Sequence, residues 1–264
     1  MLPKSVGLKV ERANHHRIEL LQALRAYQES APFVIREDRR ERAGLSYRVI
    51  VAHSLPVPDH VSLLLGDFVQ NLRASLDYMV GALRRDGPSR QSAFPICRAP
   101  DGPSGFDNQS KTKLARISDE AKERIRAMQP YGSPGLVVEP YRALDGLHTL
   151  WNVDKHRSIL VVEALVAPEF VGHNRLATEP SGIGFRFAPA GDEAEWWLPI
   201  DDRDQEFEPH FGVNVSLAAP QGFADDWLDW LEQWDIRGLV DYLYRTVRYQ
   251  VLPQLEGFNT DSGA

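Results

Sequence analysis

The sequence predicts an α+β fold in which a helical bundle, discontinuous along the chain, carries an N-terminal β-hairpin and a small antiparallel β insertion. Long segments near both ends of the chain repeat apolar residues at helical spacing. Two short segments after the first helix alternate apolar residues with polar or smaller ones, as the strands of a hairpin do. A region after residue 158 holds further strand-like segments separated by glycine and proline.

The N-terminal third of the chain contains the hairpin and the two best-defined helices. Residues 10–29 carry apolar side chains at helical spacing. Residues 33–36 and 45–52 predict two strands joined by an arginine-rich turn that Gly44 closes. The next helix begins within residues 56–59 and runs to about residue 85, with a continuous apolar stripe that must face the core.

The middle of the chain is expected to alternate loops with shorter helices. Residues 86–105 are rich in glycine and proline, which predicts a flexible loop around the short apolar segment 94–96. Ser118 is typical of a helix N-cap, and Pro130 ends the helix that follows it. Another helix is expected at residues 139–152.

We therefore expect four parts. Residues 1–158 form a helical core with the hairpin, and residues 159–220 form an antiparallel β insertion of three to five strands. Residues 221–256 form a C-terminal helix, rich in tryptophan, that returns to the core. Residues 257–264 form a disordered tail.

The composition narrows the class of protein. The chain has 264 residues, a net charge of -7 and a pI of about 5.6, which excludes the broad positive field of a non-specific nucleic-acid binder. Cys97 is the only cysteine, so neither an intramolecular disulfide nor a cysteine metal cluster is expected. We expect a cytoplasmic protein with no cofactor and no membrane segment, because no leader is recognisable and no apolar run approaches the roughly 20 residues that a span needs.

The first candidate site lies on the polar side of the long helix. Asn71, Arg73 and Asp77 fall close together there, and Arg73 and Asp77 are neighbours at i, i+4. An arginine held by a carboxylate can orient a phosphate. The alternative is an ordinary solvent-exposed ion pair on an amphipathic helix.

The second candidate site is a polar run at the end of the helix predicted at residues 139–152. If the helix continues, His148, Asn152 and His156 fall on one face at successive i, i+4 positions, a spacing that suits a metal or an acid/base pair. His156 can act as a general acid or base near neutral pH, and the cations beside it can hold an anion. Alternatively, the cations interact with the carbonyls of a helix C-terminus. The run comprises Asn152, Asp154, Lys155, His156 and Arg157.

Other conspicuous residues have ordinary explanations. Acidic neighbours balance the arginines of the hairpin turn, as on many exposed surfaces. Tryptophans at helical spacing near the C-terminus are typical of a core. The sequence contains no signature of a phosphate-binding loop, a dinucleotide fold, a zinc protease or a serine hydrolase.

Four sequence blocks together resemble a family of uncharacterised bacterial proteins. They read GDFVQNLRASLD at residues 66–77, FPI at residues 94–96, QPY at residues 129–131 and NVDKHR at residues 152–157. The family has no established activity. The resemblance therefore implies one continuous architecture across these blocks and no particular reaction.

The long helix also resembles HEPN-type helical domains, many of which are RNases. The motif of those domains is an arginine followed four to six residues later by a histidine near a helix end, and Arg73 takes the arginine position. Tyr78 stands where the histidine is expected, so the motif is broken. The resemblance implies RNA-directed chemistry in which Arg73 is catalytic and His156 substitutes for the missing histidine from a different helix.

Two hypotheses about function follow. In the first, the protein is HEPN-like and directed at RNA or a nucleotide. Arg73 and His156 are then catalytic, and the phosphate- or ligand-binding residues are Asn71, Asp77, Asn152, Asp154, Lys155 and Arg157. In the second, the protein is a non-catalytic ligand-binding or interaction protein, and the same polar blocks form a structural hydrogen-bond network.

These hypotheses differ in the geometry that they need. The first requires an open cleft where Arg73 and His156 meet, whereas the second requires them to be sealed from solvent. The candidate partners are RNA, a nucleotide or a second copy of the chain. A metal-dependent enzyme using His148, Asn152, Asp154 and His156 is less favoured, because asparagine is a poor ligand for transition metals.

Overall fold

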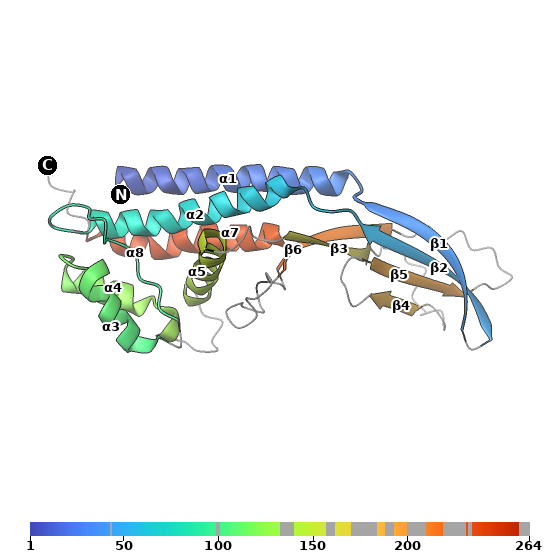
Figure 1. The fold of residues 1–264 in the computed structure, drawn as a ribbon. Coiled ribbons are helices and arrows are strands. Elements are labelled where there is room, and N and C mark those ends of the chain that lie inside the picture. The colour runs from blue at the N-terminus through green and yellow to red at the C-terminus, as the bar shows by residue number, and fades with distance from the viewer. Residues whose placement is uncertain are drawn as a thin grey trace.

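The molecule is divided between a helical part and a sheet part. The computed structural model describes residues 1–42, 44–98, 101–132, 140–156, 162–169, 184–187, 193–199, 210–218, 231 and 234–258. Its helices gather at one end and its strands extend from the other (Figure 1). The strand pairs among the described residues are all antiparallel, and helices from distant parts of the sequence pack together, which confirms the predicted α+β class with a discontinuous bundle.

Two long helices form the spine of the bundle. Helix α1 spans Lys4–Glu29 and helix α2 spans Asp59–Ala82. They lie side by side and antiparallel, because the hairpin between them reverses the chain (Figure 1). Helix α1 begins earlier than predicted because Val6 and Val10, about one turn apart, are already buried. The apolar residues that these two helices bury are Val6, Val10, Ala13, Leu20, Leu24, Tyr27, Val61, Leu65, Phe68, Val69, Leu72, Leu76, Met79 and Val80.

The hairpin is longer than the sequence suggested. Strands β1 (Phe33–Arg42) and β2 (Leu45–Ser54) pair along their whole length, with Arg42 opposite Leu45. The expectation of an arginine-rich turn was therefore wrong: the arginines belong to β1, and the connection is two residues long. Strand β1 is at an edge of its sheet, where charged side chains are tolerated on both faces. Gly44 has a φ of 77°, as short hairpin connections require.

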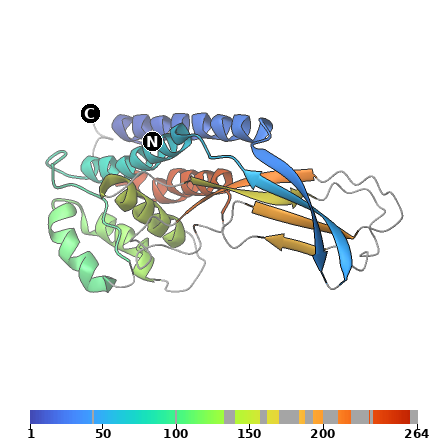
Figure 2. The same cartoon turned by 45° about the vertical axis from the view of Figure 1, so that its right-hand side comes forward.

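The hairpin and the β insertion share one sheet. Its strand order is β1-β2-β5-β4, with β4 at Gly184–Phe187 and β5 at Glu193–Pro199 (Figure 2). Strands β3 (Val162–Glu169) and β6 (His210–Leu217) form a second, two-stranded sheet. These four strands fall within residues 159–220, where three to five antiparallel strands were predicted.

Side-chain hydrogen bonds attach the β3–β6 sheet to the hairpin and to helix α1. Ser54 Oγ at the end of β2 donates to the carbonyl of Ala164 in β3 at 3.0 Å. Gln28 Nε2 near the end of α1 donates to the carbonyl of Val213 in β6 at 2.8 Å. The β3–β6 sheet is thus tied to both the hairpin and the bundle.

Part of the predicted flexible loop is a helix. Helix α3 spans Gly102–Lys113, so the expectation of a loop reaching residue 105 was wrong at its end. Pro103 lies in the first turn of the helix, where proline is favoured because its missing N–H needs no partner. Phe106 anchors the helix with 1% of its surface exposed.

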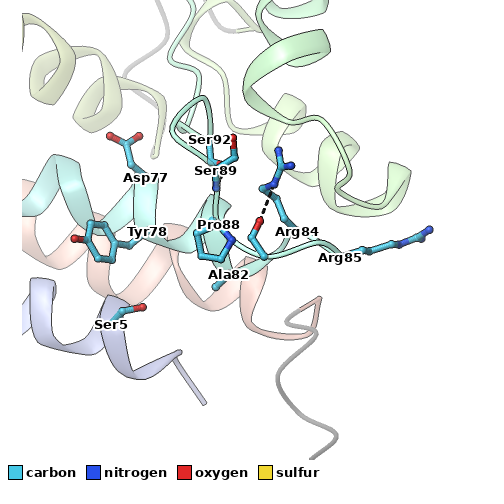
Figure 3. Close-up of a pocket in the computed structure, with 11 residues that line it drawn as sticks. Ser5, Asp77, Tyr78, Ala82, Arg84, Arg85, Pro88, Ser89 and Ser92 are labelled. Carbon is cyan, nitrogen blue, oxygen red and sulfur yellow. Dashed lines mark hydrogen bonds between the residues drawn. The ribbon is translucent and has the colours of Figure 1, made fainter.

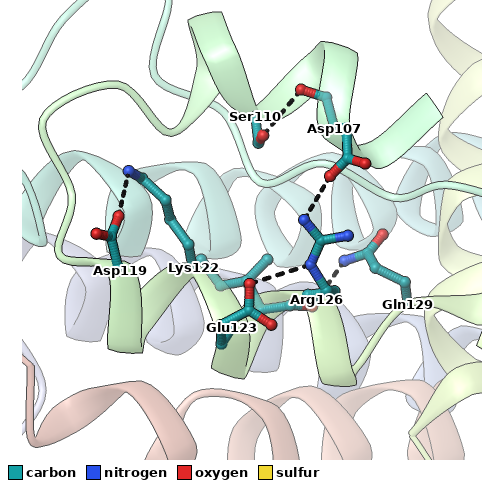
Figure 4. Close-up of polar contacts among 8 residues, drawn as sticks. Asp107, Ser110, Asp119, Lys122, Glu123, Arg126 and Gln129 are labelled. Atoms are coloured by element: carbon teal, nitrogen blue, oxygen red, sulfur yellow. Dashed lines mark hydrogen bonds and ion pairs between the residues drawn. The ribbon is translucent and has the colours of Figure 1, made fainter. Parts of the chain in front are cut away.

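Helix α3 is held against its neighbour α4 (Asp119–Ala127) by polar contacts that Figure 4 draws. Ser118 caps α4 as predicted and accepts from the backbone N–H of Ala121 at 3.2 Å. Arg126 of α4 pairs with Asp107 of α3, and its guanidinium lies 4.7 Å from the centre of the Phe106 ring. The short helix η1 (Pro130–Gly132) follows.

The remaining helices complete the bundle. Helix α5 spans Tyr141–His156, so it continues four residues beyond its predicted end. Helix α7 (Ile236–Thr246) runs into a π-helical turn, η2 (Val247–Val251), and then α8 (Pro253–Glu256). Helix α7 contacts both α1 and α5. Residues 219–230 and 259–264, which hold part of the predicted C-terminal helix and tail, lie outside the described residues.

Within the described residues, we find no helix with the length and apolar character that crossing a membrane requires.

Because α3 depends on one buried ring, Phe106→Ala is expected to destabilise the protein by about 3 kcal/mol or more, the usual cost of removing a buried phenylalanine. Thr112→Ala on the exposed face of the same helix is the control, and its free energy of unfolding should change by no more than about 0.5 kcal/mol. Urea unfolding of both variants measures the difference. Equal stabilities for the two variants would contradict the assignment of Phe106 to the core.

Candidate functional site

Arg73 of α2 is the centre of a buried polar cluster. Only 4% of its surface is exposed. Nη1 donates to Oδ1 of Asp77 at 2.6 Å, and Nη2 donates to the carbonyl of Phe94 at 2.6 Å. Oδ1 of Asp77 also accepts from the backbone N–H of Phe94 at 2.8 Å. The predicted ion pair is therefore present, but it lies against an irregular segment and satisfies both backbone polar groups of Phe94.

Trp151 of α5 connects this cluster to a second helix. Its ring centre lies 5.2 Å from Cζ of Arg73 and 4.3 Å from Nζ of Lys155. Its indole N–H donates to Oε1 of Gln70 at 2.8 Å. Cations within about 6 Å of an indole ring are attracted to it, so Trp151 holds α5 against the polar side of α2.

Asp154 of α5 packs closely against Gly66 of α2. A Cβ atom added to Gly66 of α2 would lie 2.5 Å from Oδ1 of Asp154. Glycine at position 66 therefore leaves the space that the carboxylate occupies. Burial, with a smaller contribution from Asp67, raises the pKa of Asp154.

The other predicted residues lie around this core of contacts. Asn71 is half-buried and accepts from Nζ of Lys9 in α1 at 3.2 Å. Asn152 donates to the ring of His148 one turn earlier at 3.0 Å, as their spacing predicted. Lys155 is exposed apart from its contact with Trp151. His156 is the last residue of α5, and its side chain lies outside the described part of the chain, as does all of Arg157.

The four sequence blocks that resemble the bacterial family lie next to one another in the structure. Phe94 is bound by Arg73 and Asp77, and Gly66 receives Asp154. Gln129 of the QPY block is 1% exposed. It accepts a hydrogen bond at 2.9 Å from the backbone N–H of Cys97, the residue that directly follows the FPI block. Each block thus satisfies polar groups or fills space next to another block, so much of the pattern is explained by packing.

His148 lies on α5, one turn before Asn152, and contacts Trp151. The ring stacks on Trp151 with 6.4 Å between ring centres. Burial, together with the smaller effects of Arg73, Arg98 and Lys113, lowers the pKa of His148 to about 4, and Asp101 opposes this shift weakly. His148 is therefore neutral at neutral pH.

Lys113 and Arg98 bring further charge to the same region. Lys113 of α3 donates to Oε1 of Gln109 at 2.6 Å, and burial followed by Arg73 lowers its pKa. Arg98 Nε lies 2.7 Å from Oδ1 of Asp145 in α5. The cluster is therefore built from α2, α3, α5 and the segment that connects α2 to α3.

Cys97 lies beside this cluster and is buried as a free thiol. Its sulfur accepts from Nε2 of Gln109 at 3.4 Å. Burial raises the pKa of the Cys97 thiol to about 11, so the thiolate that a nucleophile requires is scarce at neutral pH. The geometry favours a packing role for this cysteine.

Asp77 also lines a pocket (Figure 3). Its volume is about 540 Å³, within the range of small-molecule sites. It lies between the start of α1, the end of α2 and the loop that follows α2. Its lining includes Ser5, Asp77, Tyr78, Pro88 and Ser92. Tyr78 is 47% exposed, with Nζ of Lys9 5.7 Å from its ring centre.

The arrangement is better suited to binding than to acid/base chemistry. Arg73 is sealed by its partners, and Nε2 of His148 is engaged with Asn152. A histidine whose pKa is about 4 is a weak base at neutral pH. Among the residues that the structure describes, no group of three or more histidine, cysteine, aspartate or glutamate side chains is placed to hold a metal ion.

Several residues of the site escaped the sequence reasoning. The predicted site residues did not include Trp151, Lys113 or Arg98, and Gln129 was named only within the QPY block. Trp151 could have been found, because it lies three residues after His148 and so shares its side of a helix. Lys113 comes from a segment whose helix was only partly expected, so no spacing argument linked it to Arg73.

Comparison of this chain with models of protein families, with curated proteins and with solved structures gave no match in any of the three.

Gly66→Ala is expected to lower the free energy of unfolding by about 1 kcal/mol. Overpacking against Asp154 costs about 1–3 kcal/mol, and the better helix propensity of alanine offsets up to about 1 kcal/mol of that. Gly7→Ala in α1 is the control, because nothing lies within 4 Å of its added Cβ, and it should be stabilising. In an Asp154→Ala background, Gly66→Ala should also become stabilising. A destabilising Gly66→Ala in that background would contradict the proposed contact.

The lowered pKa of His148 makes stability depend on pH. The unfolded chain takes up a proton near pH 6.5 and the folded chain only near pH 4, so stability is full above pH 6.5 and falls as the pH drops towards 4. The loss reaches on the order of 3 kcal/mol. Urea unfolding of the wild type and of His148→Phe between pH 4 and 8 measures it. The stability difference between the two proteins should change with pH in this window, and a constant difference would contradict the assignment.

Proposed function

We propose that this protein is a non-catalytic binding protein for a small, hydrogen-bond-donating molecule, and that its polar blocks form a structural network beside the binding pocket. The observation that carries the proposal is the double role of Asp77. One carboxylate oxygen is bound in the network by Arg73 and Phe94, and the same side chain lines the pocket.

The burial of Arg73 supports the structural reading of the network. With 4% of its surface exposed and its two Nη atoms engaged, this guanidinium is not available to a phosphate in solution. A buried charge of this kind needs partners, since removing them leaves it uncompensated. The ion pair between Arg73 and Asp77 thereby holds the carboxylate in one orientation.

The chemistry of the pocket supports a polar ligand. Oδ2 of Asp77 makes no hydrogen bond to any described residue, and 29% of the side chain is exposed. The exposed ring of Tyr78 offers a surface for stacking, and Ser5 offers a hydroxyl. A ligand that donates a hydrogen bond to Asp77 and packs on Tyr78 fits this lining.

A HEPN-like, RNA- or nucleotide-directed activity is the second candidate. The observation that favours it is the group of cations, Arg73, Arg98 and Lys113, whose combined field acts on His148. In that reading His156 provides the proton transfer, and Lys155 and Arg157 contact the phosphates. Nucleotide binding without cleavage would fit both candidates.

The deciding experiment measures thermal stability and RNA cleavage side by side for the wild type, Arg73→Ala, Arg73→Lys and His156→Ala. Arg124→Ala, on the exposed face of α4, controls for the loss of one positive charge. We expect no cleavage by any of these proteins. Both Arg73 variants should melt earlier, with a loss of about 3 kcal/mol or more for Arg73→Ala, because Asp77 and Phe94 lose their partner.

Ligand binding is tested with a variant in which a bulky side chain fills the pocket. Ser5→Trp places a large ring in the pocket without removing a hydrogen bond of a described residue, and Lys4→Trp, one residue away, is the control. Any nucleoside or polyol that stabilises the wild type should not stabilise Ser5→Trp. The proposal fails if the wild type cleaves RNA and His156→Ala abolishes cleavage at an unchanged melting temperature.

A further inference from the structure

The ligand pocket carries hydroxyl groups from two segments of the chain. Ser5 lies in α1, and Ser89 and Ser92 lie in the loop that follows α2. Oγ of Ser92 accepts from the backbone N–H of Ser89 at 3.2 Å, and Oγ of Ser89 accepts from that of Gln91 at 3.3 Å. Neither of these two hydroxyls donates to another residue that the structure describes. Because an accepting hydroxyl keeps its own proton, both can still donate to a ligand.

Asp77 presents the opposite requirement. Its Oδ1 is bound by Arg73 and Phe94, whereas Oδ2 has no partner among the described residues. An ionised carboxylate only accepts hydrogen bonds, so the ligand must donate at Asp77 and accept at the serines. In Figure 3, Asp77 and Ser5 lie on opposite sides of the Tyr78 ring. The pocket thus offers polar groups on both sides of an aromatic surface.

The positive charges around the pocket disfavour a cationic ligand. A carboxylate and an exposed tyrosine ring are the two features that would attract an amine. Each already has a cation nearby. Arg73 is paired with Asp77 at 2.6 Å, and Nζ of Lys9 lies 5.7 Å from the centre of the Tyr78 ring. A second cation would be repelled by the first at either place.

The arginines that line the pocket do not provide a site for an anion. Arg84 donates to both carboxylate oxygens of Asp86, at 3.0 and 2.9 Å, and its side chain is 9% exposed. The Arg85 side chain points away from Asp77 and Tyr78 in Figure 3. An anion placed beside Asp77 would meet a like charge. The lining therefore suits an uncharged ligand whose groups both donate and accept hydrogen bonds.

We propose that the ligand of this pocket is an uncharged sugar, whose hydroxyl groups bond to Asp77 and the serines while its ring packs on Tyr78. A hydroxyl group can donate and accept at once, so neighbouring hydroxyls of one sugar ring meet both requirements. One face of a pyranose carries C–H groups, which pack on the negatively polarised face of an aromatic ring. Tyr78 is 47% exposed, which leaves ring surface for this contact. This inference rests on the proposed binding function and narrows its ligand to one chemical class.

The test is a calorimetric titration of the whole protein at pH 7 with the methyl α-pyranosides of glucose, galactose and mannose, which differ only in hydroxyl orientation. Adenine, a flat neutral ring without hydroxyls, and cyclohexylamine, a cation, are the comparison ligands. We expect saturable binding of at least one pyranoside and weaker binding of both comparison ligands. The best and the weakest pyranoside should differ by about threefold or more in affinity, because a well-placed hydrogen bond changes a binding constant by about that factor.

Two variants locate the sugar in the pocket. Tyr78→Leu should weaken binding of the best pyranoside by about tenfold or more, since it removes the aromatic surface, and Tyr78→Phe should retain more affinity than Tyr78→Leu. Ser92→Ala should weaken it by about threefold or more. Tyr249→Leu is the matched control, because Tyr249 is 64% exposed and lies outside the pocket lining, and it should bind like the wild type. Melting temperatures of all four variants verify that they fold.

The outcomes separate the sugar assignment from the proposed function. The assignment is overturned if none of the three pyranosides binds, or if Tyr78→Leu and Tyr249→Leu bind them equally well. If adenine or cyclohexylamine binds instead and Ser5→Trp abolishes that binding, the sugar assignment falls while the proposed binding function survives. Cleavage of RNA that depends on His156 would overturn the proposed function itself, and the sugar assignment with it.

Discussion

The burial of the Arg73 guanidinium determines how the groups around it are arranged at the helical end of this molecule. A buried cation is tolerated only when nearby groups replace its hydration, and Arg73 obtains those groups from its own helix and from the backbone of Phe94. Residues 94–97 have no regular secondary structure, yet Phe94 and Cys97 are fully buried. Their backbone polar groups are satisfied by Arg73, Asp77 and Gln129, so the charge and the irregular segment stabilise each other.

The ion pair between Arg73 and Asp77 joins the buried cluster to the ligand pocket. Asp77 contributes an acceptor to a pocket that reaches the start of α1. One turn earlier on the same face of α2, Arg73 contacts Trp151 and lies with the cations of α3 and of the connecting segment near His148. The pocket suits a hydrogen-bond donor because the second carboxylate oxygen of Asp77 has no partner among the described residues, whereas the field around His148 is positive.

Much of the fold was predictable because local signals agreed with burial. The apolar stripe of α2 and the N-cap at Ser118 are examples. The signals failed where a residue type has two uses: Pro103 and Gly105 suggested a loop, but proline in a first helical turn is favourable. For the site, the i, i+4 spacing predicted the pair of Arg73 and Asp77 correctly. Its burial was not predictable, since it depends on Phe94 and Trp151, which lie 21 and 78 residues further along the chain.

The pairing of β2 with β5 bears on how the chain folds as it is made. Helix α1, the hairpin and helix α2 are consecutive, so their contacts close short loops and form early. Val49 of β2, however, pairs with Trp197, which leaves the ribosome 148 residues later. Until then the inner edge of the hairpin has unpaired backbone groups, a template for pairing with other chains. The charged outer strand β1 protects one edge throughout synthesis, and the arrival of β5 ends the exposure of the other.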